Sequence, residues 1–491
     1  MSHAFTPVAS VSVDPAGARV HEEGWQSWSP SGGYALGDQP YRPTNANWAT
    51  VCYRPGVTVP EGAFQGEGLL ALDPGDGTPV RLWAAPDPVR EVPSIRLVVD
   101  GTVAQVSADG PVKEWTGTGI QAVLEEWAAS LGVLPPRPAP TVWCSWYEYF
   151  TSVTEDDIHE NLRAMDTLDL PIDVVQIDDG YQKALGDWLT LSGRFRSRAG
   201  TADAIRARGR RAGIWTAPFL VDPASDLAAE HPDWLVRDPA GGFLHAGRNW
   251  GHDLNVLDTT HPAAAEYLTS VFRTLRAEGY DYFKVDFLYA GALEGVRHAP
   301  ADGREGGRSE TDAPEGARRS GADAREDVGH SGSDAREGVG HSGPDAREGV
   351  GRPGSDALTA YRDGIRLIRA AIGEDAYLLG CGAPILPSIG LFDAMRVSPD
   401  TAPHRRPEAD DYSQPGQDPA EFTGAARQWQ HGRLWVNDPD CLMARPAVET
   451  RERWAAHVEA TGGLMASSDR LLSLDPWGVA TTRRLLGGDD Q

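Results

Sequence analysis

After the proline-rich string Leu134–Pro140, short apolar runs alternate with longer amphipathic segments, and this alternation limits the fold more than any other feature of the chain. The apolar runs have the length and composition of β-strands; they lie at 142–146, 173–177, 213–216, 282–285, 377–380, 394–397, 434–437 and 463–466. Segments with helical periodicity lie between most of them, at 154–165, 202–212, 262–278, 357–372, 419–430 and 448–460. Eight strands that alternate with helices predict an α/β fold, namely a closed (β/α)8 TIM barrel.

The part of the chain before this barrel has the composition of an all-β domain. Short runs rich in β-branched and aromatic residues are separated by Gly, Pro and Asp turns, as at 51–53, 81–83 and 95–99. A helical segment at 119–131 then leads into Leu134–Pro140, where the prolines prevent helix formation. We therefore predict an antiparallel β-sandwich domain over 1–133 that ends in a linking helix, the barrel domain over 134–486, and a tail at 487–491.

Residues 291–354 break this pattern. They consist mainly of Gly, Asp, Arg, Glu, Ser and His, and the string Asp-Ala-Arg-Glu recurs every eleven residues, from Asp323, Asp334 and Asp345. Because the repeats hold almost no apolar residues and contain glycine, they predict a disordered, low-complexity insertion in the barrel domain. Such a loop overhangs the C-terminal face of the barrel, so a lid is the functional alternative to repeat expansion without a function.

Net charge excludes two classes of partner. The chain has 491 residues, which is too long for a single core of ordinary size, and its 45 basic and 71 acidic residues give a net charge of −26. A surface this acidic repels nucleic acid and anionic membranes. We therefore expect a neutral small-molecule substrate.

The cysteines and the N-terminus predict a cytoplasmic location. The four cysteines are far apart and form no Cys-x-x-Cys pair, so neither a zinc ribbon nor a disulfide framework is indicated. Met1–Val13 has no basic segment followed by an apolar core, and no apolar stretch is long enough to span a bilayer. We expect a soluble enzyme with reduced thiols and no contact with a membrane.

Two carboxylates follow predicted strands of the barrel. Asp286 follows the run 280–285, and Asp400 comes soon after 391–397. Reactive side chains of a barrel gather at the C-terminal ends of its strands. A buried carboxylate needs a partner, and each of these has a cation in its own string, Lys284 or Arg396. This arrangement indicates a glycosidase that works with two carboxylates.

A second acidic string, Asp178-Asp179-Gly180, ends the strand at 173–177. Adjacent carboxylates can bind a divalent metal or accept hydrogen bonds from sugar hydroxyls, whereas Asp-Gly is also a common turn signal. The metal is the weaker functional alternative, because no third hard ligand follows at short spacing. We predict no metal and no cofactor.

Aromatic residues gather near two of the predicted strands and in the N-terminal domain. The string 143–150 holds Trp, Tyr and Phe, Trp215 lies in the strand 213–216, and Trp25 and Trp28 flank Gln-Ser. Aromatic rings stack on the apolar face of a sugar, but for each of these residues a place in the core is the favoured interpretation. Trp25 and Trp28 either belong to the sandwich core or reach into a neighbouring active site.

The acidic string 437–440, Asn-Asp-Pro-Asp, follows the seventh predicted strand. Asn, Asp and Pro residues in such a string are typical of a turn. We interpret its polar side chains as structural groups that shape the floor of a pocket.

Several of these strings form one ordered pattern, together with others: 143–150, 178–180, 214–215, 223–234, 257–262, 284–286, Cys381 and 396–400. In this order and spacing, which covers most of the chain, they resemble the bacterial α-galactosidases of glycoside hydrolase family 36, the melibiase group of clan D. The chain differs from many members of this family at two places. After Cys381 it has Gly-Ala-Pro where they have a Gly-rich run, and at 398–400 it has Ser-Pro-Asp where many have a different string before the acid.

The resemblance implies a retaining α-galactosidase that removes terminal α-D-galactosyl residues from oligosaccharides of the melibiose and raffinose type. It makes Asp286 the nucleophile and Asp400 the acid/base, and retaining glycosidases hold two such carboxyl groups about 5 to 5.5 Å apart. The other residues that it implies bind the substrate: Asp178 and Asp179 at the 4- and 6-hydroxyls, Lys284 and Arg396 at the ring hydroxyls, Cys381 near the 2-hydroxyl, and Tyr149 and Trp215 as pocket walls.

Alternatives from more than one class stay open at this point. The same site can transfer galactose to a sugar acceptor, or accept another hexose as an α-N-acetylgalactosaminidase does. A carbohydrate-binding protein without turnover is a third alternative, although a binding module has no need for paired buried acids. The simplest alternative is a barrel in which the acidic residues at the strand ends have only a structural role. The sequence also leaves open whether the chain forms a homo-oligomer.

Overall fold

The computed structural model describes residues 4–298, 357–407 and 410–487. Of the predicted insertion, residues 299–354 lie outside the described residues. Residues 291–298 are described: they complete the 3-10 helix Leu288–Ala292 and pair with the loop at Arg237 through Val296. Within the described ranges, every helix falls short of the length and apolar character needed to cross a membrane.

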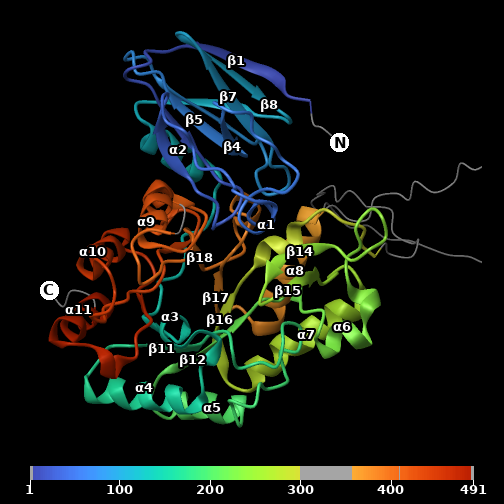
Figure 1. The fold of residues 1–491 in the computed structure, drawn as a ribbon, viewed down its shortest axis with the longest axis vertical. Coiled ribbons are helices and arrows are strands. Elements are labelled where there is room, and N and C mark those ends of the chain that lie inside the picture. Colours follow the sequence, from blue (N-terminus) through green and yellow to red (C-terminus); the bar gives the residue numbers. More distant parts are fainter. Residues whose placement is uncertain (1–3, 299–356, 408–409, 488–491) are drawn as a thin grey trace, which may run out of the picture. The chain divides into compact units, whose positions relative to one another are not determined.

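Eight parallel strands form the sheet of the barrel, in the order β19-β18-β17-β16-β12-β11-β10-β20 (Figure 1). Their bounds, in chain order, are β10 Val142–Cys144, β11 Val174–Ile177, β12 Arg211–Thr216, β16 Tyr280–Val285, β17 Tyr377–Gly380, β18 Ala394–Arg396, β19 Val436–Asp438 and β20 Ala466–Ser467. The sheet closes between its last and first strands, where the Leu464 N–H donates to the Asn437 carbonyl at 2.8 Å. The predicted (β/α)8 TIM barrel is confirmed.

Helices surround these strands (Figure 1). They are α4 Glu155–Thr167, α5 Arg198–Arg206, α7 Pro262–Ala277, α8 Ala357–Ile372, α9 Gln417–Ala426, α10 Arg451–Thr461 and α11 Pro476–Gly487. Helix α4 begins at Thr154, whose side chain and that of Asp157 form a reciprocal capping box. In α7 the buried residues recur with the helical period, at Leu268, Val271, Phe272 and Leu275.

The connection from β12 to α7 contains a small antiparallel sheet that the sequence did not predict. Its strands are β13 Leu220–Val221, β14 His245–Asn249 and β15 His252–Val256, and the short helix α6 Asp226–Glu230 lies between the first two. Strand β14 reads His-Ala-Gly-Arg-Asn, which has almost none of the β-branched and aromatic residues that mark a strand. The turn between β14 and β15 is Trp250-Gly251, and both residues have positive φ.

The N-terminal residues form the predicted antiparallel β-sandwich. One sheet has the order β1-β8-β7-β4 and the other β3-β2-β5-β6-β9, with a shared core that includes Val20, Leu72, Trp83 and Val106. The strands are β1 Thr6–Ser12, β2 Arg19–Glu22, β3 Gly32–Ala35, β4 Phe64–Glu67, β5 Leu69–Asp73, β6 Val80–Ala84, β7 Ser94–Asp100, β8 Val103–Ala108 and β9 Lys113–Gly117. Two helices belong to the same region, α1 Ala46–Val51 and the linking helix α2 Ile120–Ser130.

The loop after β2 pairs with the barrel beside the 3-10 turn Leu386–Ser388, which joins β17 to β18. As far as the structure describes the connections between barrel strands, this is the one that lacks an α-helix. The Ser27 N–H donates to the Ala383 carbonyl at 2.9 Å, and the Ile385 N–H donates to the Trp25 carbonyl at 3.0 Å. These bonds add a short antiparallel ladder to the segment that follows β17. The N-terminal loop therefore helps to form the C-terminal face of the barrel.

Candidate active site

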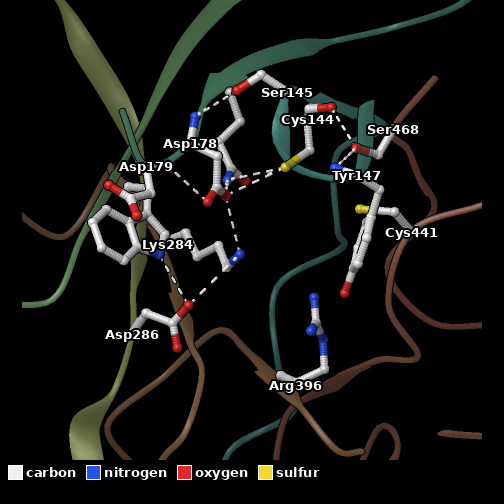
Figure 2. A network of polar contacts seen from close by, with 12 residues as sticks. Cys144, Ser145, Tyr147, Asp178, Asp179, Lys284, Asp286, Arg396, Cys441 and Ser468 are labelled. Carbon is white, nitrogen blue, oxygen red and sulfur yellow. Dashed lines mark hydrogen bonds and ion pairs between the residues drawn. The ribbon is translucent and has the colours of Figure 1, made fainter. Parts of the chain in front are cut away.

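Lys284 lies between two carboxylates inside the barrel mouth (Figure 2). Its Nζ is 3.0 Å from Asp178 Oδ2 and 3.7 Å from Asp286 Oδ2, and all three side chains are buried. Lys284 and Asp286 are two residues apart at the end of β16, so their side chains point to the same face of the sheet. Burial lowers the pKa of Lys284, but the two carboxylates more than offset this and raise that pKa well above its usual value. Lys284 is therefore a fixed positive charge.

Asp286 is the second acidic partner of Lys284, and each of its two carboxylate oxygens accepts a hydrogen bond. The Trp215 indole Nε1 donates to Oδ2 at 2.9 Å, and the Phe287 N–H donates to Oδ1 at 2.8 Å. Donors on both oxygens, together with the Lys284 ammonium, stabilise the ionised carboxylate. Trp215 is itself fixed by edge-on packing against Trp188, with ring centroids 5.9 Å apart. Asp286 is thus presented as an oriented anion.

Two further acids, Asp178 and Asp179, follow β11 and have different partners. Asp178 Oδ2 accepts a hydrogen bond from Gln176 Nε2 at 2.6 Å in addition to the Lys284 contact. Asp179 accepts from Gln182 Nε2 at 2.5 Å and from Trp250 Nε1 at 3.0 Å. Burial, reinforced by the charges of Asp178 and Asp286, raises the pKa of Asp179 to about 6.

Arg396 organises a second acidic cluster at the end of β18. Its Nη1 is 3.0 Å from Asp400 Oδ1, its Nε is 3.2 Å from Asp438 Oδ2, and its Nη2 is 2.7 Å from Asp440 Oδ1. The Asp400 side chain is 32% exposed, whereas the other members are buried. Burial raises the pKa of Asp400 to about 7, with the charges of Asp440 and Asp286 acting in the same direction against Arg396.

Strand β17 lies between the strands that carry these two groups, because β16 and β18 each pair with it. Cys381 follows β17 directly, and its N–H donates to the Val285 carbonyl at 2.9 Å. Burial and the charge of Asp286 raise the pKa of the Cys381 thiol well above its usual value. The charge of Asp400 also raises this pKa, whereas the cations Arg396 and Lys284 lower it in part. The structure therefore brings eight of the nine predicted site residues to one mouth of the barrel.

The ninth, Tyr149, points elsewhere. Its hydroxyl accepts a hydrogen bond from Asn161 Nδ2 at 2.7 Å, and Asn161 belongs to helix α4 on the outside of the sheet. The ring packs edge-on against Trp143 with centroids 6.4 Å apart. These contacts give no support to Tyr149 as a pocket wall.

Trp250 is a site residue that the sequence analysis missed. It lies in the unpredicted β14–β15 turn, donates to Asp179, and its ring is 5.0 Å from that of Phe287, the residue after Asp286. The available signal was a lone tryptophan beside glycine in a polar string, Arg-Asn-Trp-Gly-His. That signal is weak, because nothing in the string gives its distance from Asp179.

Trp28 resolves one of the open alternatives. Its ring packs edge-on against Phe287 with centroids 4.8 Å apart and lies near Tyr289 at 6.2 Å. A Cβ at Gly382, where φ is +56°, would come within 2.9 Å of the Trp28 ring, so glycine is required for this approach. Trp28 therefore contacts the segments next to Asp286 and Cys381 and is not part of the sandwich core.

In the ranges that the structure describes, no three His, Cys, Asp or Glu side chains are grouped so that they could hold a metal ion. The four cysteines are all buried and unpaired by disulfides.

Comparison with known proteins identifies the family. The family model described as Melibiase matches residues 135–297. The structure of TtGalA, the α-galactosidase of Thermus thermophilus in complex with p-nitrophenyl α-D-galactopyranoside, is 31% identical in sequence, covers 98% of this chain and 88% of that chain, and superposes with a TM-score of 0.72. Its stachyose complex gives 30% identity and a TM-score of 0.73, over 98% of this chain and 93% of that chain.

Two curated relatives match more locally. The α-galactosidase AgaA of Geobacillus stearothermophilus is 26% identical over 164 residues, which are 32% of this chain and 22% of that protein. The α-galactosidase of Escherichia coli is 32% identical over 141 residues, which are 26% of this chain and 19% of that protein. These matches thus span about a fifth of the length of each relative.

The fold and these similarities define a glycoside hydrolase built on a (β/α)8 barrel. The chain belongs to the melibiase family, the clan D family of α-galactosidases, as the resemblance in its sequence predicted.

Proposed function

We propose that this protein is a retaining α-galactosidase that hydrolyses terminal α-D-galactosyl residues of oligosaccharides such as melibiose and raffinose. The observation that carries the proposal is the difference between its two acids: Asp286 is held as an anion by Lys284 and Trp215, whereas the pKa of Asp400 is raised to about 7. Two carboxyl groups with opposed protonation states are what double displacement requires. The relative TtGalA, solved with an aryl galactoside and with stachyose, supports the choice of sugar.

In the first step of this mechanism, an Asp286 oxygen attacks the anomeric carbon while the bond to the leaving-group oxygen breaks. Asp400 gives its proton to that oxygen, so the leaving sugar departs as a neutral alcohol. The product is a galactosyl ester of Asp286, and Asp400 is now the anion. Attack removes the negative charge from Asp286, which lowers the cost of ionising Asp400.

In the second step, Asp400 accepts a proton from an incoming water while the water oxygen attacks the anomeric carbon. The ester bond breaks, galactose leaves with its original configuration, and Asp286 recovers its charge. A sugar hydroxyl in place of water gives transfer instead of hydrolysis. Product analysis with and without an added sugar acceptor separates the two outcomes.

Substrate contacts are part of the same proposal. Asp178 and Asp179 accept hydrogen bonds from the 4- and 6-hydroxyls, and Lys284, whose ammonium has three donors, reaches a ring hydroxyl beside its two carboxylates. Arg396 is a second ligand of the ring hydroxyls, Cys381 lies near the 2-hydroxyl, and Trp215 forms a wall. A cytoplasmic location remains a prediction alongside these roles.

Three aryl glycosides test the choice of sugar. The α-galactoside, α-glucoside and α-N-acetylgalactosaminide of p-nitrophenol differ only at the 4- or the 2-position. We expect release of p-nitrophenol from the galactoside at least about 100-fold faster than from the other two, because a buried polar group left without its hydroxyl is costly. Preference for the N-acetylated sugar would identify the alternative enzyme, and binding without release would identify a binding protein.

Replacing Asp400 by alanine is expected to separate substrates by their leaving groups. Hydrolysis of melibiose should fall by roughly 10²- to 10⁴-fold, because a sugar alkoxide cannot leave without a proton. Formation of the galactosyl ester from p-nitrophenyl α-galactoside should be much less affected, since p-nitrophenolate leaves unaided. Steady-state and burst kinetics on both substrates measure this, and an equal loss on both would contradict the acid role.

Activity should also fall as pH rises. The acid must carry its proton in the free enzyme, and the pKa of Asp400 is raised to about 7. We therefore expect kcat/KM for melibiose to be maintained below that pH and to fall through a basic limb near it. A rate profile on melibiose measures the limb; a profile flat to pH 9 would exclude Asp400 as the acid.

A further inference from the structure

Arg396 has more acidic partners than its charge can balance. One guanidinium, 3% exposed, contacts the carboxyl groups of Asp400, Asp438 and Asp440. If all three were ionised, the cluster would carry two uncompensated negative charges although two of its three carboxyl groups are buried, which is unfavourable. At least one member must therefore hold a proton, and the partners of each carboxyl group decide which one.

Asp440 is the member with the most donors. Its Oδ1 accepts from Arg396 Nη2 and from the Cys441 N–H at 2.7 Å, and its Oδ2 accepts from the Thr401 N–H at 2.8 Å. The Tyr147 hydroxyl also donates to Oδ2. Four donors on one fully buried carboxylate stabilise its negative charge, so the proton of the cluster belongs on another carboxyl group.

These contacts connect Asp440 to Asp400 by two routes. One passes through the side chain of Arg396, which both carboxyl groups contact. The other passes through the backbone, because the Thr401 N–H that Asp440 holds belongs to the residue next to Asp400. Tyr147, which follows β10, donates its hydroxyl to Asp440 and so helps to keep that carboxylate in place. Its hydroxyl end lies beside Arg396 (Figure 2).

We propose that Asp440, braced by Tyr147, is a positioning residue of the reaction that fixes Arg396 and the Thr401 backbone and thereby holds the Asp400 carboxyl beside the leaving group. This inference rests on the proposed function, in which Asp400 is the acid/base. It assigns a specific task to Asp440, one of the polar residues of the string 437–440 that the sequence analysis interpreted as structural groups shaping the floor of a pocket. The positive φ of Asp440, 83°, fits a conformation that these contacts enforce.

The fixed charge of Asp440 has a second consequence. After burial, the charge of Asp440 has the largest effect on the pKa of Asp400 and raises it in the same direction. The other charged or titratable groups that act on or near Asp400 are Arg396, Asp286, Lys284, Tyr147, Cys381 and Cys52. Of these, Arg396 and Lys284 favour the ionised form of Asp400, so the negative charge of Asp440 opposes them and keeps the acid protonated.

Two variants with different charge separate this role from a structural one. Asp440→Asn removes the charge but keeps an acceptor, whereas Tyr147→Phe keeps the charge and removes one donor. Without the charge, the pKa of Asp400 falls, so the basic limb of kcat/KM should move to lower pH by roughly one unit. In Tyr147→Phe the basic limb of kcat/KM should stay in place or move to higher pH. The charge of Asp440 is then less well compensated, and that charge raises the pKa of Asp400.

The two variants should also differ between substrates. For Asp440→Asn we expect kcat/KM to fall roughly 100-fold on melibiose and less than about tenfold on p-nitrophenyl α-galactoside, whose leaving group needs no proton. Tyr147→Phe should show the same preference with a smaller loss. Asp281→Asn, on the same barrel sheet and paired with Arg211, is the control and should match the unmodified enzyme in both measurements.

Equal losses on the two substrates, with an unmoved basic limb in Asp440→Asn, would overturn the inference. If Asp440→Asn does not fold, the Tyr147→Phe variant decides: the same kcat/KM as the unmodified enzyme on melibiose would overturn it. Failure of the proposed function looks different, since the unmodified enzyme would then release no galactose or would lack a basic limb assigned to Asp400.

Discussion

Replacing Asp286 by alanine is expected to reduce kcat/KM on every α-galactoside by more than about 10⁴-fold, because it removes the carboxylate that is proposed to form the galactosyl ester. Trp215 and the Phe287 N–H orient both oxygens of this carboxylate, and Lys284 lies 3.7 Å from Oδ2. The loss should be the same for melibiose and for an aryl galactoside, unlike the loss in Asp400→Ala. Burst kinetics with p-nitrophenyl α-galactoside provide the measurement.

Azide gives this prediction a positive readout. The missing carboxylate leaves space for a small anion, and azide that attacks the anomeric carbon directly gives a galactosyl azide of inverted, β configuration. Asp400 does not need to be changed for this rescue. Asp281→Asn serves as the matched control, because its carboxylate lies on the same strand β16 but pairs with Arg211. Activity within tenfold of the unmodified enzyme, or an azide product of α configuration, would remove Asp286 from the nucleophile role.

The parts of the fold that were predictable are those that depend on local composition. Strand β17 was predicted to the residue, at Tyr377–Gly380, because it is a short apolar run between polar segments. Helix α5 was predicted at 202–212 but spans Arg198–Arg206. Ser197 caps it by accepting from the Gly200 N–H at 2.9 Å, and Arg211 already belongs to β12. The helical period continued past the true end, and a start that contains glycine concealed the cap.

The candidate site was predictable where an acid and its cation share a string. Lys284 and Asp286 are two residues apart, and Arg396 and Asp400 are four apart. The groups that complete the site are remote in sequence: Trp250 is 71 residues from Asp179, and Tyr147 is 293 residues from Asp440. Such pairs depend on how the loops of the barrel converge, which no local pattern encodes. Tyr149 shows a further limit of the sequence, since an aromatic string near a strand end does not determine which ring faces the mouth.

The N-terminal loop is the part of the C-terminal face that could not be predicted from the usual (β/α)8 pattern. In most barrels a helix follows each strand, but here the segment after β17 pairs with Trp25 and Ser27 instead. Trp28 reaches Phe287 from this loop. The geometry beside Asp286 therefore depends on contacts between two regions that are far apart in the chain. A buried arginine also bonds the N-terminal loop to the segment before Asp400.

That residue is Arg427, and replacing it by methionine is expected to lower the free energy of unfolding by about 3 to 5 kcal/mol. Its Nε is 2.7 Å from Glu23 Oε1, and both side chains are fully buried. Removing the cation leaves the buried Glu23 carboxylate with only two weaker contacts, Gln430 Nε2 at 3.4 Å and His21 Nε2 at 3.9 Å. The guanidinium also donates to the carbonyls of Ser27 at 2.7 Å and Val397 at 3.0 Å, so the change loosens the N-terminal loop and the segment before Asp400 together.

Urea unfolding of three variants tests this expectation through the midpoint and the slope. Arg433→Met removes a half-exposed pair with Glu125 and should cost less than about 1 kcal/mol. The double variant Arg427→Met with Glu23→Met removes the unpaired charge and should recover part of the loss, since replacing both members of a buried pair by apolar groups is much less costly than removing one. Recovery should be incomplete because the carbonyls of Ser27 and Val397 still lack their donor. A single variant as stable as Arg433→Met would show that Arg427 does not hold the loop to the barrel.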